Sequence, residues 1–132
     1  MATALPRDLR SSVVGRTHSQ CEYCQKPDDR GINPHRHEVD HILATKHGGR
    51  IELENLAYAC FHCNRYKGAD IASLDPQTNE LVRLFNPRTQ NWVDHFLLQE
   101  DGVILSRTAE GRATTQLLHV NDPERTQVRA DL

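Results

Sequence analysis

The stretch that decides the fold covers residues 38–67 and has the sequence EVDHILATKHGGRIELENLAYACFHCNRYK. Residues 35–42, which lead into it, predict a strand that enters a loop. A Gly48-Gly49 pair predicts a turn, and residues 55–59 predict a second strand or a short helical turn. Residues 60–68 favour a helix that ends at a glycine.

The rest of the chain is expected to fold with this stretch as a single domain over residues 1–132, because the length leaves little room for a second domain. Residues 7–18 predict a short helix, and Thr108 is expected to cap a second helix that runs to about Val120. The residues from Asn121 onward are expected to be a frayed tail. Further short elements are a strand at 80–85, a helical turn at 89–94 and a β-hairpin formed by 96–99 and 103–107 around Glu100-Asp101-Gly102.

The composition excludes a membrane protein and a protein that coats nucleic acid through bulk charge. No apolar run is long enough to span a bilayer, and the N-terminus has no apolar stretch of the signal-peptide kind. The formal net charge is −2 and the sequence pI is about 6.4, which still permits a local basic patch. We therefore expect a cytoplasmic protein, and in that reducing compartment paired cysteines usually hold metal.

The cysteines fall into two pairs, Cys21-x-x-Cys24 and Cys60-x-x-Cys63, and none is left over. The two-residue gap places both sulfurs of a pair around one tetrahedral ion, so two pairs predict a closed four-thiolate zinc site. A closed site has no open position for water or substrate, which makes its role structural. Two redox pairs or free thiols are the alternative.

The order of these motifs resembles the HNH endonuclease family over residues 18–72. The matching motifs are Glu38-Val39-Asp40-His41-Ile42, Gly48-Gly49, Asn55-Leu56 and Cys60-x-x-Cys63-Asn64-x-x-Lys67. The resemblance implies a small α+β fold of the ββα-metal (His-Me finger) type, in which a β-hairpin and a helix grip one catalytic cation beside a zinc knuckle. Residues 73–132 are then a C-terminal β-hairpin and helix extension of unknown role.

The resemblance also implies roles for four residues. His41 matches the general base that activates water against a phosphodiester, and Asp40 matches the metal ligand before it. Asn55 matches the central asparagine that holds the loop and orients the base. Asn64 matches the second metal ligand, at a position where many family members have histidine.

The chemistry of these side chains agrees with those roles. An imidazole with an unperturbed pKa of about 6.5 can accept a proton from water near neutral pH. Asp40 and Asn64 both offer oxygen, and oxygen ligands favour Mg²⁺ or Mn²⁺ over softer ions. The alternative is that Asp40-His41 is an ordinary polar strand end and that Asn55 and Asn64 cap helices.

The neighbouring residues carry weaker indications. One hypothesis is that His37 or Glu38 orients His41 or contacts the metal. The alternative is that both are surface residues of the strand. Basic side chains around the motif form a phosphate path beside the metal or a solvated surface. These basic residues are Arg65 and Lys67 on the predicted helix, with Lys46, Arg50 and Arg36.

The sequence thus predicts a metal-dependent endonuclease that hydrolyses DNA phosphodiester bonds, one strand per active site, with RNA as an alternative substrate. Its expected cofactors are a structural Zn²⁺ and a catalytic Mg²⁺ or Mn²⁺. The rival hypothesis is a module stabilised by zinc that binds nucleic acid or assists a larger complex. Such a module would not cleave nucleic acid by itself. Sequence specificity, and whether the protein is a monomer or a homodimer, stay open.

Overall fold

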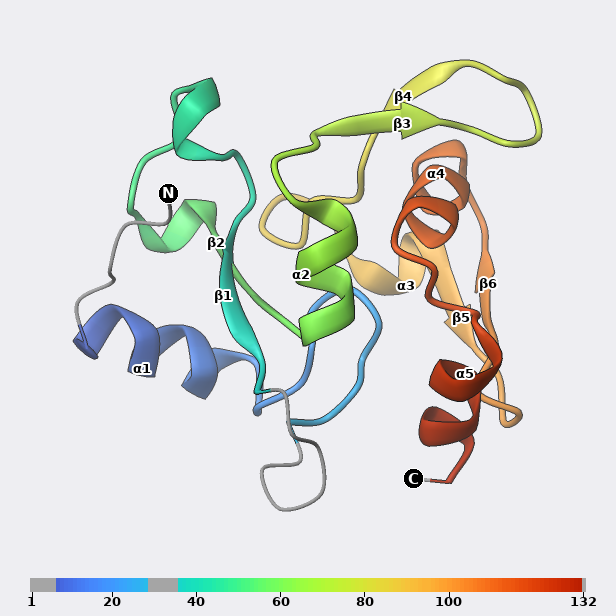
Figure 1. The fold of residues 1–132 in the computed structure, drawn as a ribbon, viewed down its shortest axis with the longest axis horizontal. Helices are drawn as coiled ribbons and strands as arrows, with labels where there is room; N and C mark the ends of the chain where they lie inside the picture. The colour runs from blue at the N-terminus through green and yellow to red at the C-terminus, as the bar shows by residue number, and fades with distance from the viewer. Residues whose placement is uncertain (1–6, 29–35, 132) are drawn as a thin grey trace.

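The computed structural model describes residues 7–28 and 36–131, and combines helices with small antiparallel sheets of two strands each (Figure 1). This mixture confirms the predicted α+β class. The elements in chain order are α1 (Arg7–Arg16), β1 (Glu38–His41), η1 (Thr45–His47), η2 (Leu53–Asn55), β2 (Leu56–Ala59), α2 (Phe61–Lys67), β3 (Ala72–Leu74), β4 (Leu81–Arg83), α3 (Trp92–His95), β5 (Phe96–Leu98), β6 (Ile104–Ser106), α4 (Ala109–Leu117) and α5 (Pro123–Ala130). None of the helices in the described ranges is long and apolar enough to cross a membrane.

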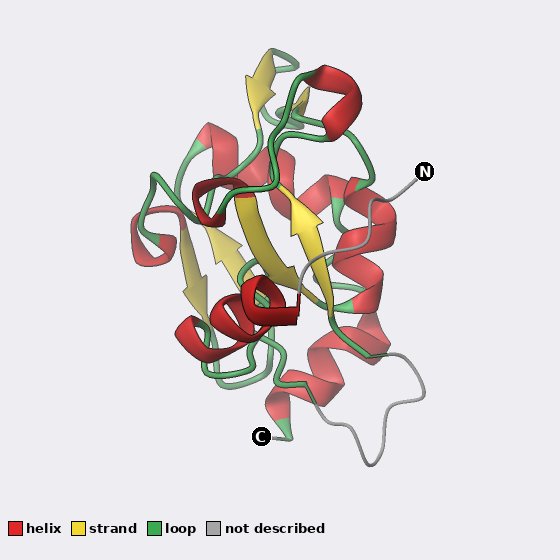
Figure 2. Ribbon diagram, turned by 90° about the vertical axis from the view of Figure 1, so that its left-hand side faces the viewer, coloured by secondary structure: helices red, strands yellow, loops and turns green. Residues whose placement is uncertain are grey.

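The β1–β2 hairpin lies at the centre of the first half of the chain. The strands pair antiparallel, with Asp40 opposite Ala57, and all four residues of β2 are buried. Successive strand side chains point to opposite faces, so Leu56 and Tyr58 meet Val13 of α1 while the two alanines face the other core cluster. Figure 2, viewed from the α1 side, shows α1 lying across these strands.

The link between the two strands is held in a fixed shape by its glycines. Gly48 ends η1 with a φ of 92°, a left-handed conformation that favours glycine. A Cβ on Gly49 would lie 1.7 Å from the carbonyl oxygen of Leu43 and 2.9 Å from Nδ2 of Asn55. The Gly48-Gly49 pair therefore allows the link to fold back closely on the residues that follow β1.

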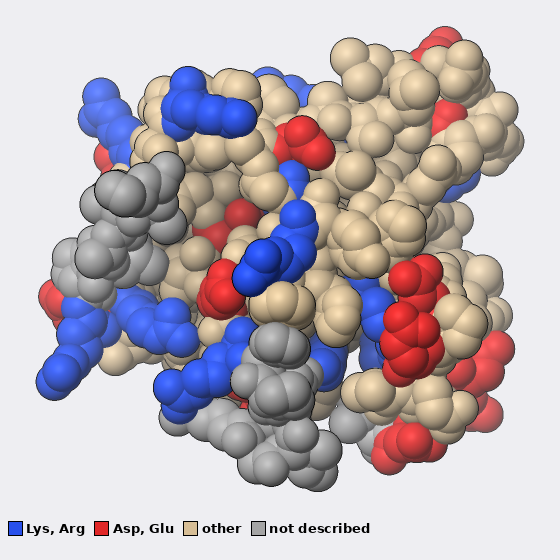
Figure 3. All heavy atoms as spheres, viewed as in Figure 1, with Lys and Arg blue, Asp and Glu red and all other residues tan. Residues whose placement is uncertain are grey.

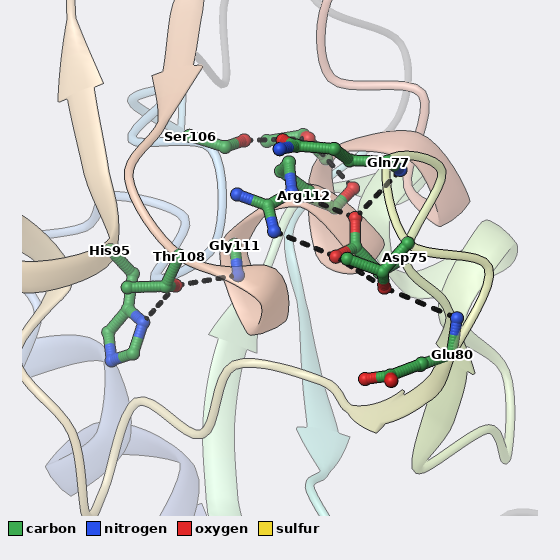
Figure 4. A network of polar contacts seen from close by, with 10 residues as sticks. Asp75, Gln77, Glu80, His95, Ser106, Thr108, Gly111 and Arg112 are labelled. Carbon is green, nitrogen blue, oxygen red and sulfur yellow. Dashed lines mark hydrogen bonds and ion pairs between the residues drawn. The ribbon is translucent and has the colours of Figure 1, made fainter.

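The extension is tied together by a buried ion pair between its first hairpin and α4. Asp75 follows β3 and is fully buried, and Arg112 donates from Nε and Nη2 to its two carboxylate oxygens at 2.8 and 2.7 Å. The backbone N–H of Gln77 and the hydroxyl of Thr78 donate to the same carboxylate at 3.0 Å each. Figure 4 shows this network beside Thr108, whose hydroxyl caps α4 by accepting from Gly111 N.

One cluster of buried residues joins the first half of the chain to the extension. It brings the cysteines and the alanines of β2 into contact with Phe85, Phe96 and Ile104 from the extension. Trp92 packs against the cluster, and its Nε1 donates to the backbone oxygen of Tyr23 at 2.8 Å. This shared cluster supports the proposal that the chain is one domain.

Most of the predicted elements are present, and the end of the chain is the main correction. The predicted strand at 35–42 is observed as β1, although residue 35 lies outside the described residues. Of residues 55–59, Asn55 ends the helical turn η2 and residues 56–59 form the strand β2. The expectation of a frayed tail from Asn121 is wrong, because residues 123–130 form α5 with Arg125 and Arg129 buried. The polar sequence of α5 concealed this, since its buried face is made of arginine rather than apolar residues. The strand β3 was not predicted at all.

Candidate active site and metal centre

The four cysteines form a compact cluster of buried sulfurs at the start of α2. All four sulfurs lie within 4.8 Å of one another, and Sγ of Cys24 is 3.6 Å from Sγ of Cys60. Four thiolates placed around zinc at about 2.3 Å stand about 3.8 Å apart, whereas sulfurs in a disulfide are about 2.05 Å apart. The four cysteines are free of disulfides, and their spacing suits a tetrahedral ion, so they are positioned to hold a metal.

The local backbone and the ionisation of the sulfurs fit a cation as well. In each pair the second cysteine donates its backbone N–H to the sulfur of the first at 3.4 Å. Burial raises the pKa of the Cys21 and Cys63 thiols, while hydrogen bonds from neighbouring sulfurs lower the pKa of Cys24 and Cys60. A divalent cation lets all four groups be thiolates together, and the all-sulfur donor set suits zinc.

Two residues of β1 pair with two residues of α2. Asn64 donates its Nδ2 hydrogen to Glu38 Oε2. The ammonium of Lys67 lies 3.3 Å from Asp40 Oδ1 and 3.2 Å from Oδ2. Residues two apart on a strand and three apart on a helix share a face, so the same strand–helix contact positions both pairs.

Asp40 is enclosed by its partners. Its side chain is 4% exposed, and the hydroxyl of Tyr23 donates to Oδ2 at 2.8 Å. Burial raises the pKa of this carboxyl above its ordinary value, although the charge of Lys67 and the hydrogen bond from Tyr23 act in the opposite direction. Asp40 is thus an oxygen donor held in one position, with an ammonium already beside it.

Asn55 holds the loop that follows His41. Its Oδ1 accepts from Leu43 N at 2.8 Å, and its Nδ2 donates to the carbonyl oxygens of Leu43 and Arg50 at 2.9 Å each. One amide therefore ties the chain just beyond β1 to the chain just beyond the glycine turn. These bonds fix the backbone two residues away from the imidazole of His41.

His41 is the last residue of β1 and is half-buried. Its Nε2 is shielded from solvent and has no hydrogen-bond partner among the described residues. By strand alternation its side chain leaves the face that carries Asp40, and no hydrogen bond joins it to Asp40, Asn55 or Asn64 in the described structure. A shielded ring nitrogen without a hydrogen-bond partner is uncommon in native proteins.

The comparison with protein families decides what this arrangement is. Residues 21–70 match the model of the HNH endonuclease family. Over this segment the chain is similar to the HNH endonuclease family. The match contains both cysteine pairs, the whole β1–β2 hairpin and α2, so the expected resemblance is confirmed. A search of curated proteins found no match to the chain.

Two residues that the sequence placed near the catalytic metal have other surroundings in the HNH domain. His37 is 1% exposed, and its Nε2 lies 2.8 Å from the carbonyl oxygen of Lys26. Its ring lies against Tyr58, so it supports the strand from the face opposite Asp40. Lys67 is 2% exposed, and its ammonium donates to the carbonyl oxygens of His41 and Ile42 at 3.1 Å each. Burial of both side chains favours structural roles over contact with the metal or with phosphate.

The remaining basic residues named from the sequence are exposed. Arg50 lies 3.8 Å from Glu52 with its side chain 82% exposed. Arg65 lies over the ring of Phe61, 4.6 Å from its centroid. Arg36 and Lys46 are exposed too. These four cations are therefore accessible at the surface, whereas Lys67 is not.

Sequence reasoning missed Tyr23 and the two arginines of α5. Tyr23 stands inside the first cysteine pair, and only the fold brings its hydroxyl to Asp40. Arg125 donates from Nη2 to Cys63 Sγ at 3.0 Å and to Cys60 Sγ at 3.5 Å. Burial lowers the pKa of Arg125, and the charges of the nearby thiolates more than reverse this effect, so its pKa is raised. No sequence signal links residue 125 to residues 60–63, because 60 residues separate them.

Proposed function

We propose that this protein is a metal-dependent endonuclease that hydrolyses phosphodiester bonds in DNA. The observation that carries the proposal is the position of His41 in a domain of the HNH family. This imidazole stands at the end of β1 with an unpaired Nε2, next in sequence to a carboxylate and close to a loop fixed by Asn55. A zinc-binding knuckle alone requires neither the histidine nor the fixed loop.

His41 acts as the general base in this proposal. A neutral imidazole near pH 7 accepts a proton from water as the water attacks phosphorus. The bonds from Asn55 to Leu43 and Arg50 hold the backbone beyond His41, which limits the motion of the base relative to substrate. His41 then supplies the acid–base chemistry and Asn55 supplies its positioning.

The oxygens of Asp40 and Asn64 are the proposed holders of the catalytic cation, and Glu38 is their exposed neighbour. Their oxygen chemistry fits Mg²⁺ or Mn²⁺. Such an ion, when bound, stabilises the negative charge that develops on the phosphate and its leaving oxygen. Tyr23 and Lys67 fix the orientation of the Asp40 carboxylate from the protein side.

The surface charge supports a local rather than a global contact with DNA. On the face drawn in Figure 3, acidic side chains gather in the region of α5, whereas most basic ones lie toward α1 and α2. Lys46, Arg50 and Arg65 are exposed cations near the candidate site in sequence, and they are the proposed contacts for the DNA strand. A single HNH centre hydrolyses one strand at a time.

A second candidate function is a nucleic-acid-binding or accessory module that does not cleave. One observation favours it: the Asp40 carboxylate already has the Lys67 ammonium at 3.2 Å as a counter-ion. A divalent cation at Asp40 must share or displace that partner. The two candidates differ in whether the purified chain cuts DNA at all.

The test is incubation of the purified full chain with supercoiled plasmid under Mg²⁺, Mn²⁺ or Zn²⁺ alone. We expect nicked plasmid first with Mg²⁺ or Mn²⁺, and little product with Zn²⁺. His41→Ala should lower the rate by roughly 10²- to 10⁴-fold with an unchanged circular dichroism spectrum. His119→Ala, at an exposed histidine of the extension, is the matched control and should cut at the normal rate. Binding without cutting under every metal would favour the accessory module, and cutting with Zn²⁺ alone would contradict the oxygen site.

A further inference from the structure

The last helix, α5, buries a charged face rather than an apolar one. Arg125 and Arg129 are one helical turn apart on the same side of α5, and each is 6% exposed. Arginine is almost never buried this deeply unless it is paired. The partners of these two guanidinium groups therefore decide why α5 docks where it does.

The partners of Arg125 are the sulfurs of the second cysteine pair. Nη2 of Arg125 lies 3.0 Å from Cys63 Sγ and 3.5 Å from Cys60 Sγ, and Nη1 donates to the carbonyl oxygen of Leu118. A hydrogen bond from a cation to a thiolate is charge-assisted and stronger than one between neutral groups. This contact joins the C-terminal helix directly to the ligands of the metal centre.

Arg129 extends the same contact toward the hairpin of the extension. Its Nε donates to Gly102 O at 2.8 Å, and its Nη2 donates to Val120 O at 2.5 Å. A Cβ on Gly102 would lie 1.9 Å from Thr126 O, so α5 rests directly on the turn between β5 and β6.

A zinc ion held by four thiolates carries a net charge of about −2. The Arg125 guanidinium contacts two of these sulfurs and offsets part of that charge. Without Arg125, the cysteine cluster would keep its four ligands but lose its cationic neighbour.

We propose that Arg125 is an outer-shell partner of the four-cysteine zinc centre, and that this contact holds the C-terminal helix against the metal ligands. The proposal assigns a role to the end of the extension, which lies outside the family match. It concerns the structural metal and does not depend on whether the protein cleaves DNA. Residues that contact metal ligands in this way typically contribute about 10- to 100-fold to metal affinity.

The first experiment measures zinc affinity and release in the full chain by competition with a chromogenic chelator. Arg125→Met removes the charge and both sulfur contacts at similar side-chain length. We expect its zinc affinity to fall about 10- to 100-fold and its zinc release to accelerate. Arg83→Met, the same change at an exposed arginine of β4, is the matched control. Wild-type affinity and release in Arg125→Met would overturn the proposal.

Two further readouts separate a metal-linked role from simple packing. With Co²⁺ in place of zinc, loss of the N–H···S bonds in Arg125→Met should move the sulfur-to-cobalt charge-transfer band to longer wavelength. Hydrogen exchange in the zinc-loaded variant should rise across residues 123–131 while β2 and α2 stay protected. An unchanged band position, or unchanged exchange of α5, counts against the proposal.

A third variant covers the case in which Arg125→Met does not fold. Arg125→Lys keeps the charge but replaces the planar guanidinium by a single ammonium. An ammonium cannot donate to both sulfurs and to Leu118 O in the same geometry. Its zinc affinity should fall between those of the wild type and the Met variant. Wild-type affinity and a wild-type cobalt band in this variant would show that the guanidinium contacts are irrelevant to the metal.

Discussion

The ammonium of Lys67 lies 3.2 Å from the carboxylate of Asp40, and both side chains are almost completely buried. The same ammonium donates to the carbonyl oxygens of His41 and Ile42. One cation on α2 therefore neutralises the candidate metal ligand and holds the end of the strand that carries the candidate base. The candidate site therefore depends on an ion pair that the sequence motif does not reveal.

Lys67→Met should destabilise the protein strongly. It leaves the Asp40 carboxylate buried without its counter-ion, at a cost of about 3–5 kcal/mol in the free energy of unfolding. The difference in free energy of unfolding between the wild type and Lys67→Met should become smaller as pH falls. Protonation of Asp40 removes the unpaired charge, and the native variant then binds more protons than its unfolded state. Urea unfolding between pH 5 and pH 8 measures both effects.

The control for this prediction is Lys46→Met, which changes an exposed lysine of η1 in the same way and should leave stability nearly unchanged. The double variant Asp40→Asn, Lys67→Met removes both charges and should recover part of the lost stability. A double variant no more stable than Lys67→Met alone would show that the ion pair is not the reason for the loss.

Asn55→Ala should loosen the loop behind His41. The substitution leaves the N–H and carbonyl of Leu43 and the carbonyl of Arg50 without their partner, which costs about 1–3 kcal/mol. If His41 is the base, cleavage should fall by roughly 10- to 100-fold at temperatures where the variant is still folded, because the base is misplaced. Thermal unfolding measures the loss of stability, and plasmid cleavage measures the fall in rate.

Two companion variants make the Asn55 prediction specific. Asn55→Asp keeps the acceptor for Leu43 N but loses both donated bonds, so it should fall between the wild type and Asn55→Ala. Asn91→Ala, at an exposed asparagine with no cap bond to α3, should behave as the wild type. Equal cleavage by the wild type and Asn55→Ala would remove the positioning role.

The ion pair between Asp75 and Arg112 should make part of the stability depend on acid pH. The Arg112 guanidinium holds the pKa of the Asp75 carboxyl well below its usual range, with help from Gln77 N and Thr78 and against the effect of burial. A carboxyl in the unfolded chain has a pKa of about 3.9. The stabilisation is therefore fully present above about pH 4 and is lost as pH falls below it.

Asp75→Asn tests this dependence. The variant should have a lower melting temperature than the wild type at pH 7, and the difference should shrink below about pH 4. Asp94→Asn, at an exposed aspartate of α3, is the control and should follow the wild type throughout. A difference that stays constant from pH 7 to pH 2.5 would mean that the charge of Asp75 is not what stabilises the hairpin.

The local motifs of the HNH segment were predictable because each depends on near neighbours in the chain. The spacing of each cysteine pair, the glycine pair in the link and the capping threonine of α4 act over a few residues. The positions of β1, β2, α2 and α4 follow from such signals. The polar sequence of α5 gave no such signal, because its buried face is stabilised by sulfurs 60 residues away.

The sequence by itself therefore predicted the family resemblance, most elements of residues 38–67 and the grouping of the four cysteines into a cluster that could hold a metal ion. Only the tertiary structure decided that Lys67 is buried against Asp40, that Tyr23 binds the same carboxylate and that α5 closes over the cysteine site. These relationships join residues far apart in the chain, and burial makes them strong. Water is excluded there, so each charge needs a partner that only the completed fold supplies.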